Sequence, residues 1–241
     1  MYAIETFDLT KRYKDVLAVD KLNLKINHGE LFSLLGVNGA GKTTTIKMLS
    51  CLTKPTAGYA LIHGESILSS PLKVKEIISV SPQETAVASN LNVYENLCLI
   101  AGVYGHDQTA SKKMAAEAIE KYGMEEIWTK RAKTLSGGWQ RRLGIAMALI
   151  TNPEVLFLDE PTLGLDVLAR RELWKVIRSL KGKITIILTT HYMEEAEALS
   201  DRICIMKKGS VKAIGTASEL KEKTKTDNIE DAFVAIIGEE K

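Results

Sequence analysis

The sequence predicts an α/β fold: a mostly parallel sheet flanked by helices, with an N-terminal antiparallel β-subdomain and an inserted α-helical subdomain. Three patterns lead to this prediction. The first thirty residues alternate apolar and polar side chains, which is typical of antiparallel strands. From about residue 84 to residue 152 the periodicity is mostly helical. After residue 152 short apolar strands alternate with helices, as in a parallel sheet covered on both faces.

Each element follows from a local pattern. The antiparallel strands end at a turn over 28–30, and an apolar strand over 31–35 then leads into a glycine-rich loop and a helix over 43–51. A cluster of Thr, Pro and Gly predicts a turn over 53–58. In the inserted subdomain, Asn92 is followed three residues later by Glu95, a spacing that predicts a capping box at the start of a helix.

The remaining elements are predicted from periodicity in the same way. They are helices over 93–104, 111–122 and 138–150, strand 155–158, helix 167–180, strand 184–189, helix 192–199 and strand 202–206. We expect one domain over residues 1–225, with the helical subdomain inserted at about 84–152. Residues 226–241 are expected to form a short helical C-terminal tail.

The composition is that of an ordinary globular protein, with 45% hydrophobic and 26% charged residues among 241. The 32 basic and 30 acidic residues leave a net charge of +2, so nucleic acid is not expected as a partner. Three scattered cysteines favour a reducing, cytosolic compartment. The longest apolar runs fall far short of the roughly 20 residues that cross a bilayer, so any membrane contact is expected to come through a partner.

The sharpest motif covers 36–43, where GVNGAGKT matches the phosphate-binding pattern GxxxxGK[ST] at every fixed position. Glycines let successive backbone N–H groups face a triphosphate, and the following helix adds its positive end. Lys42 is expected to reach the β- and γ-phosphates, and the Thr43 hydroxyl to bind Mg²⁺. The motif predicts a P-loop NTPase core. Its expected nucleotide-binding residues are Gly36, Asn38, Gly39, Ala40, Gly41, Lys42, Thr43 and Thr44.

A second site lies at 155–160, VLFLDE, where an apolar strand ends in two adjacent carboxylates. Carboxylates near a core are costly to desolvate, and a metal ion supplies a reason for them. Asp159 is expected to hold Mg²⁺, and Glu160 to act as the general base that polarises the attacking water. Taken alone, the segment could be an acidic strand end at the surface, but a nearby P-loop disfavours that interpretation.

The segment 135–142, LSGGWQRR, narrows the class. It resembles the LSGGQ signature of ATP-binding cassette (ABC) ATPases, and it lies less than twenty residues before the acidic strand. Four more segments fit this family in the family's order, so the resemblance covers roughly residues 2–220. They are similar to the adenine-stacking aromatic residue (Tyr13), the Q-loop glutamine (Gln83), the D-loop (163–166) and the switch histidine (His191).

The resemblance implies roles for these residues. Tyr13 and Asp166 would contact the nucleotide, Gln83 would bind Mg²⁺ and assist catalysis, and His191 would be catalytic. Three positions depart from the family's pattern: Trp139 stands where Gln is usual, Leu163 where a small residue is common, and Val167 where proline is common. No catalytic residue is lost, so we expect activity to be intact. Arg141 and Arg142 are expected to be solvated helix charges.

The resemblance also implies that two copies share each ATP. Ser136, Gly137 and Gly138 of one subunit would contact the γ-phosphate of ATP bound by Lys42 of the other, in a head-to-tail dimer. The second ATPase subunit would be an identical or a related chain. Hydrolysis would remove the bridging phosphate and let the dimer open.

By the same resemblance the chain is the ATP-hydrolysing motor of a transporter, cytoplasmic and peripheral on the inner face of the cell membrane. Gln83 and the helical subdomain after it would meet separate transmembrane subunits. Apolar residues there are interpreted either as a docking groove or as packing within the subdomain: Val87, Leu91, Val93 and Leu97. The run over 191–197 and the short carboxyl terminus resemble the drug- and polysaccharide-export branch.

Two other classes of protein fit the sequence less well. A soluble ABC ATPase acting on ribosomes or DNA usually carries two cassettes or a long coiled coil, and the near-neutral charge also disfavours it. A GTPase or small-molecule kinase would leave the signature unexplained, and no Asn-Lys-x-Asp segment for guanine recognition occurs. The sequence does not encode the transported substrate.

Overall fold

The computed structural model describes residues 2–84 and 86–238, and a six-stranded sheet forms its centre. The strand order is β11-β10-β4-β9-β8-β7, and every neighbouring pair is parallel except β10 with β11. All residues of the neighbouring strands β4, β9 and β8 are buried, as expected for a sheet covered on both faces. The strands are β4 (Leu31–Leu35), β7 (Ile78–Ser81), β8 (Val155–Asp159), β9 (Thr185–Thr190), β10 (Arg202–Lys207) and β11 (Ser210–Gly215).

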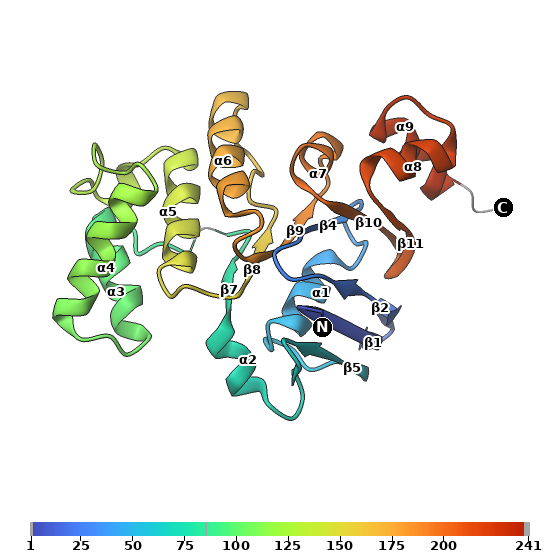
Figure 1. The fold of residues 1–241 in the computed structure, drawn as a ribbon, viewed down its shortest axis with the longest axis horizontal. Coiled ribbons are helices and arrows are strands. Elements are labelled where there is room, and N and C mark those ends of the chain that lie inside the picture. Colours follow the sequence, from blue (N-terminus) through green and yellow to red (C-terminus); the bar gives the residue numbers. More distant parts are fainter. Residues whose placement is uncertain (1, 85, 239–241) are drawn as a thin grey trace.

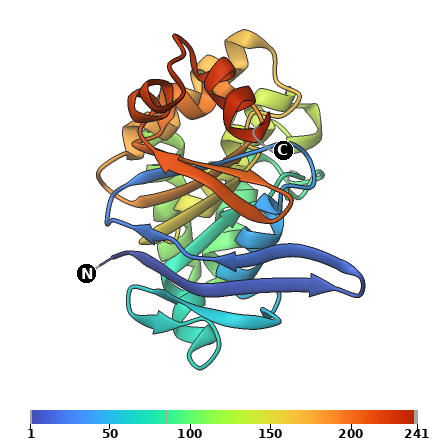
Figure 2. The ribbon, with the colours of Figure 1, turned by 90° about the vertical axis from the view of Figure 1, so that its right-hand side faces the viewer.

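An antiparallel sheet packs beside it. Its strand order is β2-β1-β5-β6, and β3 pairs with β1. Ile4 and Ile62 from this sheet share one core with Phe32 and Phe157 of the central sheet, and Ile46 of helix α1 fills the space between them. Figure 2 shows the two sheets one above the other. The strands are β1 (Ile4–Tyr13), β2 (Val16–Leu22), β3 (Lys25–Ile26), β5 (Ala57–Ile62) and β6 (Glu65–Ser66).

Helices cover both faces of the central sheet. In Figure 1, α1 and the antiparallel sheet lie on one side, whereas α6, α7, α8 and α9 lie on the other. The successive side chains of each strand point to opposite faces, so Leu156 and Phe157 belong to different cores. The helices of this body are α1 (Lys42–Leu49), α2 (Pro71–Ile77), α6 (Val167–Leu180), α7 (Met193–Leu199), α8 (Ala217–Thr224) and α9 (Ile229–Gly238).

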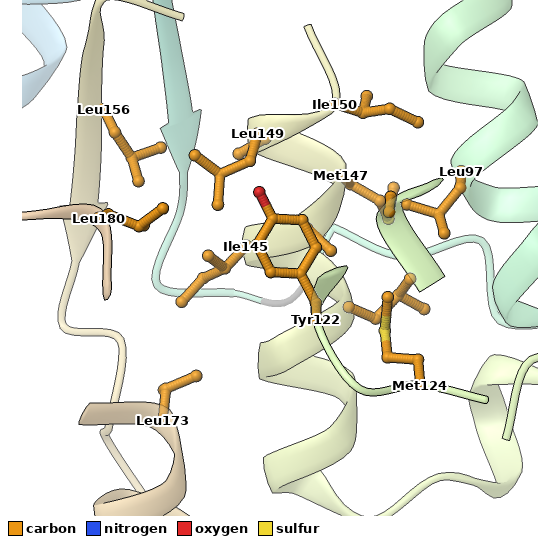
Figure 3. Close-up of a cluster of buried hydrophobic side chains, with 14 of the residues drawn as sticks. Leu97, Tyr122, Met124, Ile145, Met147, Leu149, Ile150, Leu156, Leu173 and Leu180 are labelled. Carbon is orange, nitrogen blue, oxygen red and sulfur yellow. The ribbon is translucent and has the colours of Figure 1, made fainter. Parts of the chain in front are cut away.

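The predicted helical subdomain is inserted between β7 and β8 and lies at one end of the long axis (Figure 1). Its helices are α3 (Val93–Val103), α4 (Gln108–Lys121) and α5 (Gly137–Leu149). The capping box is confirmed, because Glu95 N donates to Asn92 Oδ1 and Asn92 N donates to Glu95 Oε2, both at 2.8 Å. Figure 3 shows Leu97, Tyr122 and the side chains of α5 meeting Leu156 and Leu173 in one core.

Two interpretations were open for the apolar residues after Gln83, a docking groove or packing. Val93 and Leu97 are fully buried in the helical core, so packing is the right interpretation for these two. The predicted turn over 53–58 overlaps strand β5, which already begins at Ala57. Strands β5, β6, β7 and β11 and helices α2 and α8 were not predicted.

The C-terminal helix α9 occupies the segment where a helical tail was expected. Phe233 and Ile236 are buried and share a core with Ile205 of β10, Ala196 of α7 and Leu220 of α8. Helix α9 therefore packs on the body of the protein, although the division of the chain at residue 225 stays a prediction.

Candidate active site

The P-loop connects the buried strand β4 to helix α1. Gly39 and Gly41 have positive φ angles of 80° and 102°, a region that favours glycine. A Cβ atom at Gly41 would collide with the carbonyl oxygen of Ala18, so this position needs glycine on both counts. The loop borders a cavity of about 550 Å³, which we call the nucleotide cavity. Its lining residues are Val16, Leu17, Ala18, Asn38, Gly39, Ala40, Gly41, Lys42, Thr43, Thr44, Gln83, Glu160, Leu163 and His191.

Lys42 is a buried cation in the first turn of α1. Its Nζ donates to the carbonyl oxygens of Gly36 at 2.8 Å and Val37 at 3.3 Å, and it lies 3.4 Å from Glu160 Oε1. The first N–H groups of an α-helix have no intrahelical acceptor, so the start of α1 offers further donors beside the amine. Together they make the positive end of the cavity, where a triphosphate fits.

Thr43 and Asp159 bring hard oxygen ligands together. Thr43 Oγ1 donates to Asp159 Oδ1 at 3.1 Å, and Thr189 Oγ1 donates to the same carboxylate oxygen. Asp159 lies opposite Thr189 in the β8–β9 register, so the sheet itself aligns these groups. A hydroxyl and a carboxylate beside a phosphate site are the donors that Mg²⁺ prefers, and the residues present therefore fit this ion.

Glu160 has the geometry expected of a strained functional residue. Its φ is 47°, a left-handed conformation that is costly for a side-chain-bearing residue unless the surroundings hold it. Its backbone N donates to Thr189 O at 3.1 Å and to Thr189 Oγ1 at 3.0 Å. The buried carboxylate has Lys42 Nζ near Oε1 and His191 Nδ1 3.2 Å from Oε2. The predicted base and the predicted switch histidine thus face each other in one cavity.

The signature segment lies elsewhere on the surface. Ser136 is the N-cap of α5, and Gly137 and Gly138 form its first turn. Ser136 and Gly138 line a separate hollow of about 140 Å³, which we call the signature hollow; its other lining residues are Trp139, Arg142, Ala169, Glu172 and Leu173. Trp139 packs against the helical core, and the Arg142 guanidinium lies 4.5 Å from its ring centroid. A helix N-terminus with glycines leaves backbone N–H groups open to an anion.

Comparison with known proteins decides the family. The family model described as ABC transporter matches residues 19–163. The doxorubicin resistance ATP-binding protein DrrA of Mycobacterium tuberculosis (strain CDC 1551 / Oshkosh) is 42% identical over 233 residues, covering 92% of this chain and 70% of the relative. The chain belongs to the ABC transporter family. As an ABC ATP-binding subunit it binds ATP and hydrolyses it for transport, as the sequence predicted.

Solved structures confirm the predicted fold class. One described as the ATP binding subunit of an ABC transporter has a TM-score of 0.85 at 27% identity, covering 98% of this chain and 99% of that chain. The dimeric post-hydrolysis structure of the ATP-binding cassette MJ0796, bound to ADP and Pi, has a TM-score of 0.79 at 27% identity, covering 88% and 98%. None of the ABC subunit's helices within residues 2–84 and 86–238 is long and apolar enough to cross a membrane.

Besides the signature residues, three nucleotide-binding residues predicted for this ABC subunit do not line the nucleotide cavity. One is Gly36, whose carbonyl oxygen accepts from Lys42 Nζ. Tyr13, at the end of β1, is 43% exposed and does not line the cavity, whereas Val16, Leu17 and Ala18 of the following strand do. Asp166 is the N-cap of α6, and its Oδ1 accepts from Ala169 N at 2.9 Å. The structure brings the other predicted P-loop, metal and catalytic residues together, apart from the signature segment.

Two residues of the ABC signature helix have contacts that the sequence did not reveal. Gln140 Nε2 donates to the carbonyl oxygens of Ala132 at 3.1 Å and Leu135 at 3.2 Å, and so braces the loop before α5. Arg141 was expected to be solvated, which is wrong. Its Nη1 donates to Pro82 O at 3.0 Å, next to Gln83, and burial lowers its pKa while Asp159 opposes that shift. Arg141 therefore joins the signature helix to the Q-loop.

Proposed function

We propose that this ABC subunit powers the export of an amphipathic small molecule through separate membrane subunits, using Mg²⁺–ATP held between two ATPase subunits. One observation carries the two-subunit part. The nucleotide cavity and the signature hollow are separate surfaces of one chain, and each offers donors for the same anion. A head-to-tail dimer would join the signature hollow of one copy to the nucleotide cavity of the other. The name of the relative DrrA, which records doxorubicin resistance, supports a drug-like cargo.

Within each composite site, Lys42 would leave its carbonyl partners and bind the β- and γ-phosphates. Thr43, Asp159 and Gln83 would hold Mg²⁺, which neutralises phosphate charge when bound. Glu160 would accept the proton of the attacking water, and His191, 3.2 Å from its carboxylate, would hold that carboxylate in place. Ser136, Gly137 and Gly138 of the second copy would close over the γ-phosphate.

We place the contact with the membrane subunits beside the Q-loop. A cavity of about 130 Å³ lies between the end of β7, helix α3 and helix α5, and it combines apolar walls with the Arg141 cation. Its lining includes Pro82, Ala86, Ile100, Tyr104, Arg141 and Met147. Because Arg141 also bonds to Pro82 beside Gln83, a helix docked there would act directly on the Q-loop.

The test is ATP-dependent dimerisation of the Glu160→Gln variant, measured by light scattering with Na⁺-ATP and with ADP. We expect a dimer with ATP and a monomer with ADP, because the amide keeps the shape of the site but removes the base. Glu154→Gln, at the residue immediately before β8, is the matched control and should behave as the wild type, because Glu154 does not line the nucleotide cavity. A Glu160→Gln variant that binds ATP yet stays monomeric would contradict the shared site. For the cargo, ATP-driven accumulation of doxorubicin in inside-out vesicles carrying the reconstituted transporter is expected, and its absence would refute doxorubicin as a cargo.

A further inference from the structure

Glu195 is a fully buried carboxyl that has no role in the site described above. It lies in α7, four residues after His191, and its side chain is closed off from solvent. Trp174 Nε1 donates to Glu195 Oε1 at 3.0 Å. Burying a carboxyl group costs free energy, so its position here calls for an explanation.

Three segments meet at this carboxyl. The Thr162 hydroxyl faces it from the loop that carries Glu160, and the Thr190 hydroxyl faces it from the strand end that carries His191. Arg170 and Trp174 face it from α6, the helix that follows the D-loop. Burial raises the pKa of Glu195, while the two hydroxyls, the indole and Arg170 oppose the rise.

The same neighbours lead to His191. The Arg170 guanidinium lies 4.6 Å from the ring centroid of Tyr192, and that ring lies 4.1 Å from the ring of His191. Tyr192 N donates to Thr190 Oγ1 at 3.0 Å, and Thr190 O accepts from Gly36 N of the P-loop at 3.4 Å. The P-loop, the base loop and the histidine segment are therefore all linked to one buried group.

This network also has unused hydrogen-bonding capacity. Among the residues that the structure describes, Glu195 Oε2, Thr162 Oγ1 and Arg170 Nε are buried and make no hydrogen bond. Unsatisfied buried polar atoms are rare, and several in one place indicate a site where geometry matters more than stability.

We propose that Glu195 is a positioning residue for ATP hydrolysis: it holds the loop 160–166 and the segment 190–192 in a fixed position relative to α6. The inference rests on the roles proposed for Glu160 and His191. The backbone of Glu160 is strained, and such a conformation persists only if the surrounding structure holds it. Thr162, two residues later in the same loop, connects this loop to Glu195. Because Glu195, Thr162, Arg170 and Trp174 do not line the nucleotide cavity, losing the carboxyl should disturb turnover and leave ATP affinity unchanged.

The experiment compares Glu195→Ala and Glu195→Gln in the full chain, measuring kcat for ATP hydrolysis and Kd for a fluorescent ATP analogue. We expect Glu195→Ala to lower kcat about 100-fold, because small misplacements of catalytic groups are that costly, while Kd stays within about two-fold. Glu195→Gln keeps the shape and the acceptor for Trp174, so kcat should stay within a few-fold of wild type. Glu197→Gln is the matched control on the same helix: it is exposed, pairs with Lys221 at 2.8 Å, and should change neither value.

Thr162→Val and Trp174→Phe keep the test decisive if Glu195→Ala does not fold. Thr162→Val removes a hydroxyl that faces Glu195, and Trp174→Phe removes the indole N–H that donates to it. Each variant should lower kcat without raising Kd. Wild-type kcat in Glu195→Ala, or in both of these variants, would overturn the proposal. A variant in which kcat falls, Kd for the ATP analogue rises and the melting temperature falls together would also overturn the proposal, because that combination indicates a merely structural role. Glu160→Gln, run in parallel, separates the two ideas: normal turnover there would refute the proposed base, whereas a selective kcat loss in Glu195→Ala would still stand.

Discussion

Lys42 and Glu160 form a buried pair that ATP would have to separate. The amine lies 3.4 Å from the Glu160 carboxylate and is held by two backbone carbonyls, partners that it would exchange for phosphate oxygens. A buried charge that loses its partner is costly, and a γ-phosphate would replace the carboxylate as that partner. Nucleotide binding would therefore release Glu160 for its role as base.

Lys42→Ala tests this exchange. We expect the Kd for ATP to rise by about 10-fold or more, because a charge-assisted bond to phosphate is lost. The measurement is titration with a fluorescent ATP analogue. Lys47→Ala, an exposed lysine on the same helix, is the control and should bind normally. An unchanged Kd in Lys42→Ala would show that the amine does not contact the nucleotide.

Individual site residues were predicted best from the sequence where they belong to one short motif. The P-loop glycines, Lys42, Thr43 and Asp159 belong to short motifs whose spacing fixes their geometry, and the structure brings them together. Tyr13 and Asp166 were expected at the nucleotide through resemblance alone, and in the single chain they lie outside the cavity. Arg141 was misjudged because its partner is a backbone carbonyl 59 residues away, which no local pattern reveals.

Helices α5 and α6 approach closely at Gly138. A Cβ atom at this position would lie 2.9 Å from the Cβ of Ala169, well inside normal contact. Gly138→Ala should therefore destabilise the protein by about 1–3 kcal/mol through overpacking, and the double variant with Ala169→Gly should regain most of that loss. Thermal unfolding of both variants is the measurement. A Gly138→Ala variant with the wild-type melting temperature would show that the two helices separate easily.

Burial in the helical subdomain raises the pKa of Tyr122 to about 12. The folded state then keeps this proton between pH 10 and pH 12 while the unfolded state loses it, so stability should fall as pH rises through that range. Tyr122→Phe removes the effect. The melting temperature should decrease less between pH 9 and pH 11 in Tyr122→Phe than in the wild type. Equal decreases in the two proteins would contradict the raised pKa of Tyr122.

Strands were missed by the sequence analysis where they are short or where turn-forming residues overlap their first positions. Strand β7 has four residues and is defined by its parallel pairing with β8, which the sequence does not display. Strand β5 starts inside an apparent turn cluster, where Gly58 has a φ of 71°. Strand β11 is joined to β10 by a two-residue hairpin turn, Lys208-Gly209, in which both residues have positive φ; the glycine is the part of this turn that the sequence shows.

For the whole molecule, the decisive expectation is that one chain is only half of each ATP site. Ser136→Arg should leave ATP binding by the monomer intact yet block hydrolysis, because Ser136 lies outside the nucleotide cavity and the bulky cation would occupy the signature hollow. In the Glu160→Gln background it should also abolish the ATP-dependent dimer. Hydrolysis assays and light scattering are the measurements. Ser179→Arg, an exposed serine near the end of α6, should have no effect, whereas normal hydrolysis in Ser136→Arg would refute the shared site.

The last helix has a consequence for how the protein tolerates damage. Phe233 and Ile236 pack against Ile205 of the central sheet and Ala196 of α7, the helix that also carries Glu195. A protease that removed α9 would expose apolar side chains of β10 and α7, although α7 would keep its contacts with β4, β9 and α6. The shortened chain would tend to aggregate, although no P-loop residue belongs to the core that α9 completes.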